Sequence, residues 1–193
     1  MTLDFYNQHA KEYFFQTVKA DLSATYKKFL PFIKKEGLIL DLGCGSGRDS
    51  YYFKQNGYQI VAVDGSKELA TQASLLLGQP VLNQLFEDIQ FNEEFDGVWA
   101  CASLLHVSAK ELPSILIKIR ESLKKEGVFY ISVKEGEGSG VEDGRFFQYY
   151  SPSQFHHLIS QCGGLKIETA WSHTELRDEG NKVVWLNVIG RKL

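Results

Sequence analysis

The sequence lacks several features that would place the chain in a special class. No apolar run approaches the ~20 residues that a membrane-spanning helix needs, and Met1-Thr2-Leu3-Asp4 lacks the basic-then-apolar order of a signal peptide. Only three cysteines are present, Cys44, Cys101 and Cys162, and they are widely spaced. Neither a disulfide framework nor a metal site is therefore expected. We expect a cytoplasmic protein that does not associate with a membrane.

The chain also lacks a large excess of charges of one sign. The net charge is −3 over 193 residues, and acidic and basic residues are interspersed, which argues against an extended nucleic-acid-binding surface. The 44% hydrophobic and 23% charged content is typical of a globular domain. Because no repeat, low-complexity tract or linker interrupts the chain, we expect one domain over residues 1–193. It would consist of an N-terminal helical cap, residues 1–36, and a core, residues 37–193.

Apolar periodicity, capping residues and glycines predict alternating helices and strands. Two helices are expected within residues 3–33, and a capping box at Ser108–Glu111 predicts a helix over residues 108–123. Alternating β and α elements imply a mostly parallel sheet with helices on both faces. In such sheets a ligand lies beyond the carboxyl ends of the strands. Further helices are expected over residues 48–55, over residues 66–77 with Ser66 as the N-cap, and over residues 151–162 with Ser151 and Gln154 at its start. Strands are expected over residues 38–42, 59–64, 81–82, 95–100, 127–133, 165–170 and 183–190.

The first expected strand ends in a glycine-rich loop, Asp41-Leu42-Gly43-Cys44-Gly45-Ser46-Gly47-Arg48. Glycine has no Cβ, so the backbone can turn sharply and a ligand can approach it closely. The following helix would point its first N–H groups toward that ligand. A dinucleotide-binding loop requires Gly-x-Gly-x-x-Gly. Counted from Gly43, its third glycine would fall at Arg48, which disfavours a nicotinamide cofactor.

The pattern Asp41-x-Gly43-x-Gly45-x-Gly47 resembles the first motif of class I S-adenosylmethionine (SAM) dependent methyltransferases. The glycine loop and the residues after it are similar to those of tellurite-resistance, thiopurine and type 11/12 methyltransferases. The resemblance covers residues 37–135 by motif. It implies an α/β, Rossmann-like, doubly wound sheet of seven strands in the order 3-2-1-4-5-7-6, with the last strand antiparallel.

The resemblance also implies roles in binding SAM. The glycine loop would hold the methionine part, Asp41 would help to hold its amino group, and Arg48 would pair with its carboxylate unless it is simply solvated. Asp64 ends the next strand, where a carboxylate can accept two hydrogen bonds from a ribose diol. The alternative for Asp64 is a surface acid at a strand end.

Two later segments complete the expected cofactor site. Asp88 stands where the family carries the acid that reads the adenine amino group, with Ile89 packing on the ring, although an acidic surface loop is the alternative. Residues 95–106 resemble the fourth motif, and residues 99–103 within it would leave the fourth strand beside the glycine loop, where backbone and small side chains border the transferable methyl group. The alternative for the apolar part is the packing of a central strand. The residues expected to bind SAM are Asp41, Gly43, Cys44, Gly45, Gly47, Arg48, Asp64, Gly65, Asp88, Ile89, Ala102 and Ser103.

The acceptor side of the site is defined by fewer signals. His106 would lie at the ligand-facing edge, where a histidine can take a proton from a nucleophile. Its alternative is a hydrogen bond to a carbonyl or packing on the pocket wall. Residues 134–144 are rich in glycine and acids, which favours a mobile lid over a phosphate loop. The candidate acceptor-side residues, for which core or helix packing is the alternative, are Tyr6, Tyr13, Lys134, Arg145, Tyr149 and Tyr150.

The sequence therefore predicts an enzyme that transfers the methyl group of SAM to an O, N or S atom of a small molecule. Direct in-line displacement would leave S-adenosylhomocysteine. A separate recognition domain, a basic stripe and the Asn/Asp-Pro-Pro-Tyr signature are all missing, which disfavours a macromolecular acceptor. The alternatives are an RNA or protein methyltransferase that uses a local patch, and a SAM-binding regulator without turnover. The identity of the acceptor and the oligomeric state do not follow from the sequence.

Overall fold

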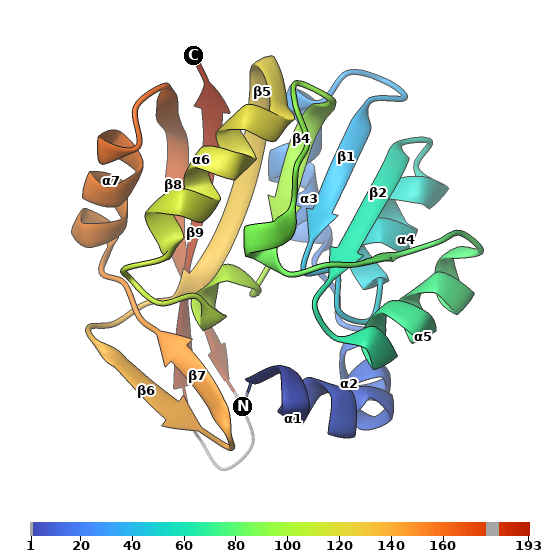
Figure 1. The fold of residues 1–193 in the computed structure, drawn as a ribbon. Coiled ribbons are helices and arrows are strands. Elements are labelled where there is room, and N and C mark those ends of the chain that lie inside the picture. The colour runs from blue at the N-terminus through green and yellow to red at the C-terminus, as the bar shows by residue number, and fades with distance from the viewer. Residues whose placement is uncertain (1, 177–181) are drawn as a thin grey trace.

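Seven strands form one sheet in the computed structural model, which describes residues 2–176 and 182–193 (Figure 1). Their order is β3-β2-β1-β4-β5-β9-β8. The first five are parallel, and β9 is antiparallel to both of its neighbours. This confirms the expected Rossmann-like sheet, because β8 and β9 are its sixth and seventh strands. The strands are β1 Leu38–Leu42, β2 Gln59–Asp64, β3 Leu82–Asn83, β4 Phe95–Ala100, β5 Leu123–Lys134, β8 Leu165–Leu176 and β9 Lys182–Lys192.

Helices cover both faces of the sheet, because successive strand residues point to opposite faces. In β4, Val98 and Ala100 pack into the larger core beneath α6 (Leu112–Ser122) and α7 (Pro152–Gln161). Trp99 faces the other way, toward α3 (Ser23–Phe29) and α4 (Arg48–Gln55). The helix α5 (Lys67–Leu77) packs against β2. Among the residues that the structure describes, no helix has the length and apolar character needed to cross a membrane.

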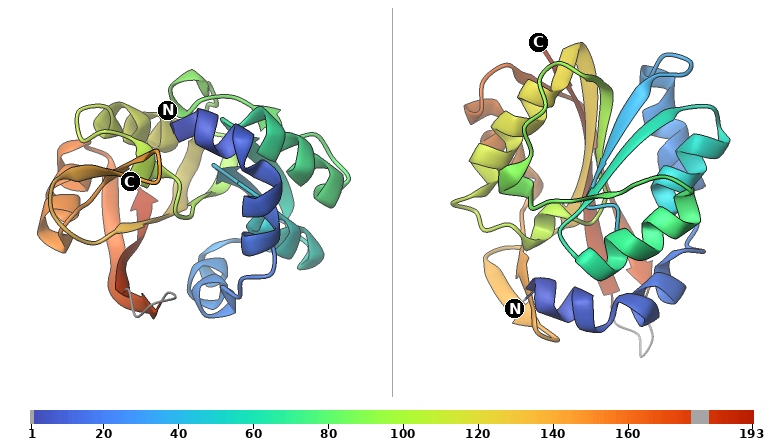
Figure 2. Two further views of the ribbon diagram at one scale, coloured as in Figure 1. Left: turned by 90° about the horizontal axis from the view of Figure 1, so that it is seen from below. Right: turned by 45° about the vertical axis from the view of Figure 1, so that its right-hand side comes forward.

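The carboxyl ends of the parallel strands are covered by two segments from distant parts of the chain. The helices α1 (Thr2–Gln8) and α2 (Ala10–Thr17) lie across this edge, and a hairpin of β6 (Ser139–Glu142) and β7 (Arg145–Gln148) lies beside α1 (Figures 1 and 2). The expected cap over residues 1–36 is therefore divided, since only α1 and α2 cover the strand ends. The helix α3 instead belongs to the layer that packs on the sheet.

The start of α6 differs from its prediction. Ser108 does not cap this helix: its hydroxyl donates to the Glu111 carboxylate at 2.6 Å, and the helix begins at Leu112. Pro113 follows in the first helical turn, where its missing N–H group costs no hydrogen bond. The two other capping predictions are confirmed, because Ser66 accepts from Leu69 N and Ser151 forms a capping box with Gln154.

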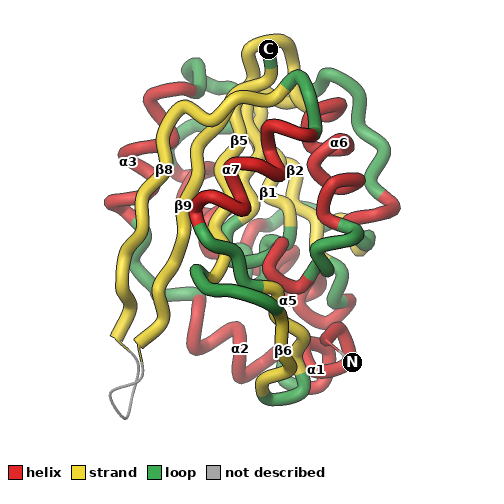
Figure 3. The backbone as a smooth tube through the Cα atoms, turned by 90° about the vertical axis from the view of Figure 1, so that its left-hand side faces the viewer, coloured by secondary structure: helices red, strands yellow, loops and turns green. Residues whose placement is uncertain are grey.

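The segment of residues 134–144, which contains β6 and the hairpin turn, was expected as a loop. The sequence nevertheless contains a turn signal that predicts the hairpin. The two strands are joined by Asp143-Gly144, both of which have positive φ, +49° and +75°. An Asp-Gly pair between β-rich segments is typical of a two-residue hairpin turn. The strands β8 and β9 also run further than predicted, side by side beyond the other strands (Figure 3). Three short 3₁₀ helices complete the structure: η1 Leu30–Phe32, η2 Phe86–Asp88 and η3 Leu104–His106.

The packing of α6 on the sheet yields a stability prediction. Leu116 is fully buried on α6, whereas Leu75 on α5 is 81% exposed. We expect Leu116→Ala to lower the free energy of unfolding by about 2–5 kcal/mol, because it leaves a cavity in the larger core. Leu75→Ala is the matched control and should change it by less than about 0.5 kcal/mol. Urea unfolding of both variants measures the difference, and equal losses would contradict the described packing.

Candidate functional site

The glycine loop after β1 is shaped by close packing as well as by its turn. Gly43 has a φ of +81°, and a Cβ there would lie 2.5 Å from the Cβ of Ser103. Gly47 has a φ of +77°, and its Cβ would lie 3.0 Å from that of Ala73 on α5. The backbone N–H groups of Gly43 and Cys44 both donate to the carbonyl of Val63, at 2.8 and 3.0 Å. The loop is therefore fixed against β2, with room only for glycine at these points.

Asp64 connects the glycine loop to the start of α5. One carboxylate oxygen accepts from Gly45 N at 2.8 Å, and the other accepts from Ser66 N at 2.8 Å. Burial raises the pKa of Asp64, while the two backbone hydrogen bonds act in the opposite direction. Each oxygen has a second lone pair. Asp64 can therefore still accept hydrogen bonds from ligand hydroxyl groups.

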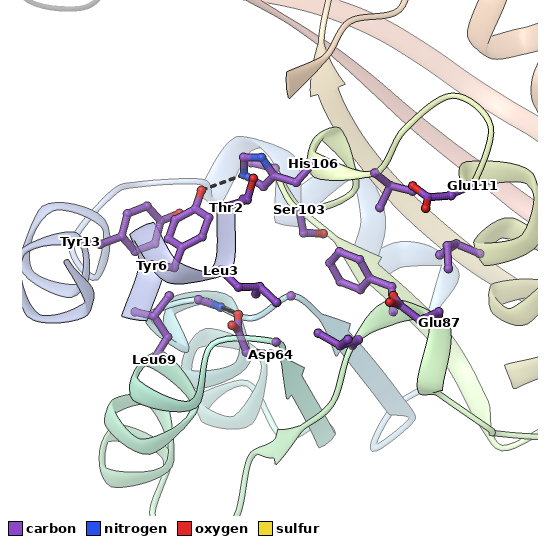
Figure 4. Close-up of a pocket in the computed structure, with 18 of the residues that line it drawn as sticks. Thr2, Leu3, Tyr6, Tyr13, Asp64, Leu69, Glu87, Ser103, His106 and Glu111 are labelled. Carbon is purple, nitrogen blue, oxygen red and sulfur yellow. Dashed lines mark hydrogen bonds between the residues drawn. The ribbon is translucent and has the colours of Figure 1, made fainter. Parts of the chain in front are cut away.

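A cavity of about 390 Å³ lies between this loop, α1 and η3 (Figure 4). Its polar groups come from the two N-terminal helices, from Asp64 and Glu87, and from η3 and the residues after it, and the rest of its wall is largely apolar. It brings together nine of the residues singled out from the sequence: Tyr6, Tyr13, Gly43, Gly45, Asp64, Gly65, Ala102, Ser103 and His106. The lining residues that sequence reasoning missed are Thr2, Leu3, Leu69, Leu85, Phe86, Glu87, Val107, Glu111, Ser114 and Ile115.

Ala102 and Ser103 follow β4 and form the part of the wall beside the glycine loop. Ala102 has a φ of +49°, which is rare for a residue with a Cβ. Its N–H group donates to the hydroxyl of Ser132 at 2.8 Å, and the Ser103 hydroxyl donates to the carbonyl of Leu42 at 2.7 Å. These bonds hold the strained turn against β1 and β5. Strained residues of this kind are common at ligand sites.

Six of the twelve residues that were expected to bind the cofactor do not line the cavity: Asp41, Cys44, Gly47, Arg48, Asp88 and Ile89. Cys44 packs with Ala62 and Ala73, and Ile89 is buried in the larger core. Asp88 is exposed on η2, where its neighbour Glu87 lines the cavity instead. Gly47 faces α5 rather than the cavity. The adenine-reading role of Asp88 is therefore not supported by its position, and the structure makes Glu87 the candidate acid there.

Arg48 is bound to a neighbouring acid rather than free for a ligand. Its Nε and Nη2 atoms donate to the two carboxylate oxygens of Asp49, at 2.6 and 2.9 Å. The same buried carboxylate accepts from the Tyr26 hydroxyl at 2.5 Å and from the Trp99 indole at 2.8 Å. Burial alone would raise the pKa of Asp49, but these donors, led by the Arg48 guanidinium, hold it below its usual range. The expected pairing of Arg48 with a cofactor carboxylate would therefore have to use the N–H groups that Asp49 leaves free.

Asp41 is fully enclosed beneath the loop. One of its oxygens accepts from both the backbone N–H and the hydroxyl of Ser50, at 3.1 and 2.6 Å. Burial, together with the nearby charge of Asp49, raises the pKa of Asp41 to about 8. Asp41 is therefore largely protonated at neutral pH and supports the first turn of α4. It does not line the cavity.

His106 joins the two segments that cover the strand ends. The carbonyl of Phe146 can only accept, so Nδ1 of His106 carries the proton that it donates at 2.6 Å. In the neutral ring, Nε2 then accepts from the Tyr6 hydroxyl at 2.7 Å, which is the bond drawn in Figure 4. Burial lowers the pKa of His106 to about 4, against the effect of the bond to Phe146. The ring is neutral at physiological pH.

The other acceptor-side candidates lie in the hairpin region, outside the cavity lining. Lys134 is buried and pairs with Glu142 at 2.7 Å, and the Tyr149 hydroxyl bonds the same carboxylate. The guanidinium of Arg145 lies over the ring of Phe5 on α1. Tyr150 is buried with a hydroxyl that has no hydrogen-bond partner among the described residues. These four side chains thus lie around the hairpin, next to the cavity wall that Tyr6 and His106 form.

Comparison with known proteins gives one consistent result. The family described as "Methyltransferase domain" matches residues 40–131, which span the glycine loop, Asp64 and the turn after β4. The matched segment of the chain is thus similar to a methyltransferase domain. An uncharacterized methyltransferase of Staphylococcus carnosus is 25% identical over 168 residues, covering 81% of this chain and 79% of its relative.

Solved structures of methyltransferases share the fold. A SAM-dependent methyltransferase of Methanosarcina mazei superposes with a TM-score of 0.76 at 20% identity, covering 87% of this chain and 98% of its own. The 1,6-didemethyltoxoflavin-N1-methyltransferase of Burkholderia thailandensis gives a TM-score of 0.75 at 22% identity, covering 98% of this chain and 85% of its own. Its structure contains 1,6-didemethyltoxoflavin and S-adenosylhomocysteine. The fold of this chain is thus shared over most of the length of both structures.

The protonated state of Asp41 has a measurable consequence for stability. The pKa of Asp41 in the folded protein lies above the unfolded value of about 3.9. The contribution of Asp41 to the free energy of unfolding is therefore complete at low pH and is lost as pH rises toward about 8. We expect the wild type to lose stability relative to Asp41→Asn between pH 5 and 8, by at most about 1.4 kcal/mol per pH unit. The asparagine amide oxygen can still accept from Ser50.

Urea unfolding of the cofactor-free protein across this pH range measures that difference. Asp143→Asn is the control, because the Asp143 side chain is 82% exposed, and its profile should run parallel to that of the wild type. Parallel profiles for the wild type and Asp41→Asn would show that Asp41 is ionised in the folded protein.

Proposed function

We propose that this methyltransferase transfers the methyl group of SAM to a small molecule that binds beside Tyr6, Tyr13 and His106. The observation that carries the proposal is the make-up of the cavity. Its wall combines the backbone of Gly43 and Gly45 and the carboxylate of Asp64 with these three side chains from α1, α2 and η3. A volume of about 390 Å³ is within the range of sites for small ligands and cofactors.

The lining residues suggest how SAM lies in the cavity. The carboxylate of Asp64 is placed to accept from the two ribose hydroxyls, since both of its oxygens keep a free lone pair. Leu85 and Phe86 offer an apolar surface for the adenine ring, with Glu87 beside them. The backbone at Gly43 and Gly45 leaves room for the methionine part. The methyl group would then point toward Ser103 and the Tyr6–His106 pair.

The reaction proposed here is a direct displacement. A bond forms between the acceptor atom and the methyl carbon, the carbon–sulfur bond breaks, and its electron pair remains on sulfur. The protein contributes by alignment and by excluding water. Leu3 of α1 supports the exclusion of water, because a Cβ on Gly65 would lie only 2.9 Å from its side chain. The first helix thus packs directly over the ribose end of the site.

His106 is assigned to positioning rather than to proton removal. With a pKa lowered to about 4 and its Nε2 already bonded to Tyr6, its ring is a weak base in this arrangement. A weak base contributes little to general-base catalysis near neutral pH. We therefore propose that His106 fixes the direction of the Tyr6 hydroxyl and holds α1 against the hairpin. The acceptor proton then passes to solvent water, during or after displacement, rather than to His106.

The preference for a small acceptor follows from the cover over the strand ends. Both α1 and the hairpin lie across the edge where an acceptor must approach, and Phe146 N donates to Thr2 Oγ1 at 3.0 Å between them. A folded macromolecule would have to displace this cover, whereas a small molecule needs only a narrow opening. The Burkholderia neighbour, whose bound compound is a small molecule, fits the same view.

Calorimetric titration with S-adenosylhomocysteine tests the cofactor site. We expect micromolar binding to the wild type and none of NADH. Asp64→Ala should weaken binding by about 1–3 kcal/mol, because it removes the proposed ribose acceptor. Asp88→Ala is the matched control, and its affinity should stay within about twofold of the wild type because Asp88 is exposed and outside the cavity.

Two results would count against this assignment of the site. Equal losses for Asp64→Ala and Asp88→Ala would return the adenine-reading role to Asp88. No binding to the folded wild type would remove the proposed function altogether. Tight binding without methyl transfer to any acceptor in a broad panel would instead favour a different reaction on the same fold. A structural neighbour with a TM-score of 0.76 is named as a [4+2]-cyclase.

The assignment of His106 makes a spectroscopic prediction. Nitrogen-detected NMR of the imidazole should show a neutral ring protonated on Nδ1 at pH 7, with titration only near pH 4. Tyr6→Phe removes the bond to the neutral Nε2, so the pKa of His106 should move upward. A proton on Nε2 at pH 7, or an imidazolium at that pH, would contradict the positioning role.

A further inference from the structure

Arg145 is a mostly buried cation whose bonding capacity is not filled. It begins β7, its side chain is 20% exposed, and its guanidinium carbon lies 4.5 Å from the centre of the Phe5 ring and 5.3 Å from that of Phe147. Its Nε atom is buried and has no hydrogen-bond partner among the described residues. Its ion-pair partner, Asp143, is 3.5 Å from Nη2 and 82% exposed. Such a pair is weak, because solvent screens it.

A second cation strengthens the positive charge of this region. Lys134, at the end of β5, places its Nζ atom 3.7 Å from the centre of the Phe147 ring, so the two cations share one aromatic residue. Lys134 is neutralised by Glu142 at 2.7 Å. Arg145 has no comparable partner at its Nε. The positive charge of Arg145 is thus balanced only by its weak, solvent-exposed pair with Asp143.

This charge acts on the residues that form the acceptor side of the cavity. Arg145 and Lys134 both lower the pKa of His106, and Arg145 also counters the rise that burial causes in the pKa of Tyr6. Tyr6 and His106 line the cavity, and Arg145 lies directly behind them, between α1 and the hairpin. Since Arg145 interacts with the Tyr6 side chain, a ligand group that extends from the cavity past Tyr6 would approach the guanidinium.

We propose that Arg145 binds a carboxylate of the methyl acceptor, so that the acceptors are small molecules that carry a negative charge. The planar guanidinium presents Nε and Nη as a fork that matches the two oxygens of a carboxylate. A bound carboxylate would accept a hydrogen bond from the buried Nε, and it would give the guanidinium a stronger ion pair than the one with Asp143. The inference rests on the proposed function, since it names the substrate class of that same site.

The chemistry of the donor favours the same class of acceptor. SAM carries a sulfonium, and an unneutralised arginine near it is unfavourable in a site from which water is excluded. A carboxylate between the two offsets both charges. The carboxylate acts as the anchor, because Arg145 lies behind the cavity wall and not at the position of the methyl group. The methylated atom is then a separate O, N or S atom of the acceptor.

Binding of matched acids and amides to the protein saturated with S-adenosylhomocysteine tests the inference. Benzoate and benzamide form one pair, and acetate and acetamide form a smaller one. We expect at least one acid to bind at least tenfold more tightly than its amide, with the difference lost in Arg145→Gln. Arg145→Lys keeps the charge but not the fork, so it should retain only part of the preference.

The control variant is Arg191→Gln. Arg191 also lies near an aromatic ring, that of Phe32, but it is paired with Glu168 and Glu126 on the sheet. It should leave the acid preference unchanged. Thermal unfolding of each variant shows whether α1 stays packed, and Arg145→Lys keeps the test valid if Arg145→Gln loosens it.

Three outcomes would overturn the inference. The first is equal binding of acid and amide in both pairs, and the second is an unchanged acid preference in Arg145→Gln. The third is binding of inorganic phosphate alone at Arg145, which would replace the carboxylate with another anion. The S-adenosylhomocysteine titration is made first in the same cell. Its failure would reject the proposed function, whereas normal cofactor binding without an acid preference would reject only the role of Arg145.

Discussion

The buried carboxylate of Asp49 is the constraint on which much of the structure depends. It accepts from Arg48 on its own helix, from Tyr26 on α3 and from Trp99 on β4. A carboxylate and a guanidinium lose several kcal/mol of hydration when they are buried, and only well-placed donors offset that loss. The cluster therefore fixes the helix that follows the glycine loop relative to the centre of the sheet. Asp49 also pairs with Arg48, and, in addition to burial, its charge raises the pKa of Asp41.

The acceptor side of the site depends on contacts between segments far apart in the sequence. Tyr6 meets His106, and Thr2 meets Phe146, so that the first helix and the hairpin cover the strand ends together. These contacts are few, and most are made by side chains. The cover is thus held less firmly than the glycine loop, whose backbone is bonded directly to β2. A firm cofactor side and a lightly held acceptor side suit a site that must admit and release small molecules.

The parts that the sequence predicted are those encoded locally. Strand runs, the Ser66 and Ser151 caps and the glycine spacing each depend on a few adjacent residues, and the seven-stranded order followed from the family resemblance. The misplaced residues depend on distant partners: Arg48 is held in a cluster with Tyr26 and Trp99, and Lys134 is held by a hairpin that had been expected as a loop. Leu3 and Ser114 line the cavity only because α1 and α6 converge there, which no local pattern indicates. The hairpin itself could have been predicted from Asp143-Gly144.

The charges around the site are divided in a way that suits the proposed transfer. Asp64, Glu87 and Glu111 line the cavity where SAM is expected, whereas Arg145 and Lys134 lie behind its acceptor wall. Acidic groups favour a cationic cofactor on one side, and the cations favour an anion on the other. Methyl transfer from a sulfonium leaves a neutral thioether, so the cofactor loses the charge that the acids attract. The same electrostatic arrangement that assembles the two reactants therefore weakens the hold on the product, and release of S-adenosylhomocysteine is favoured without a separate device.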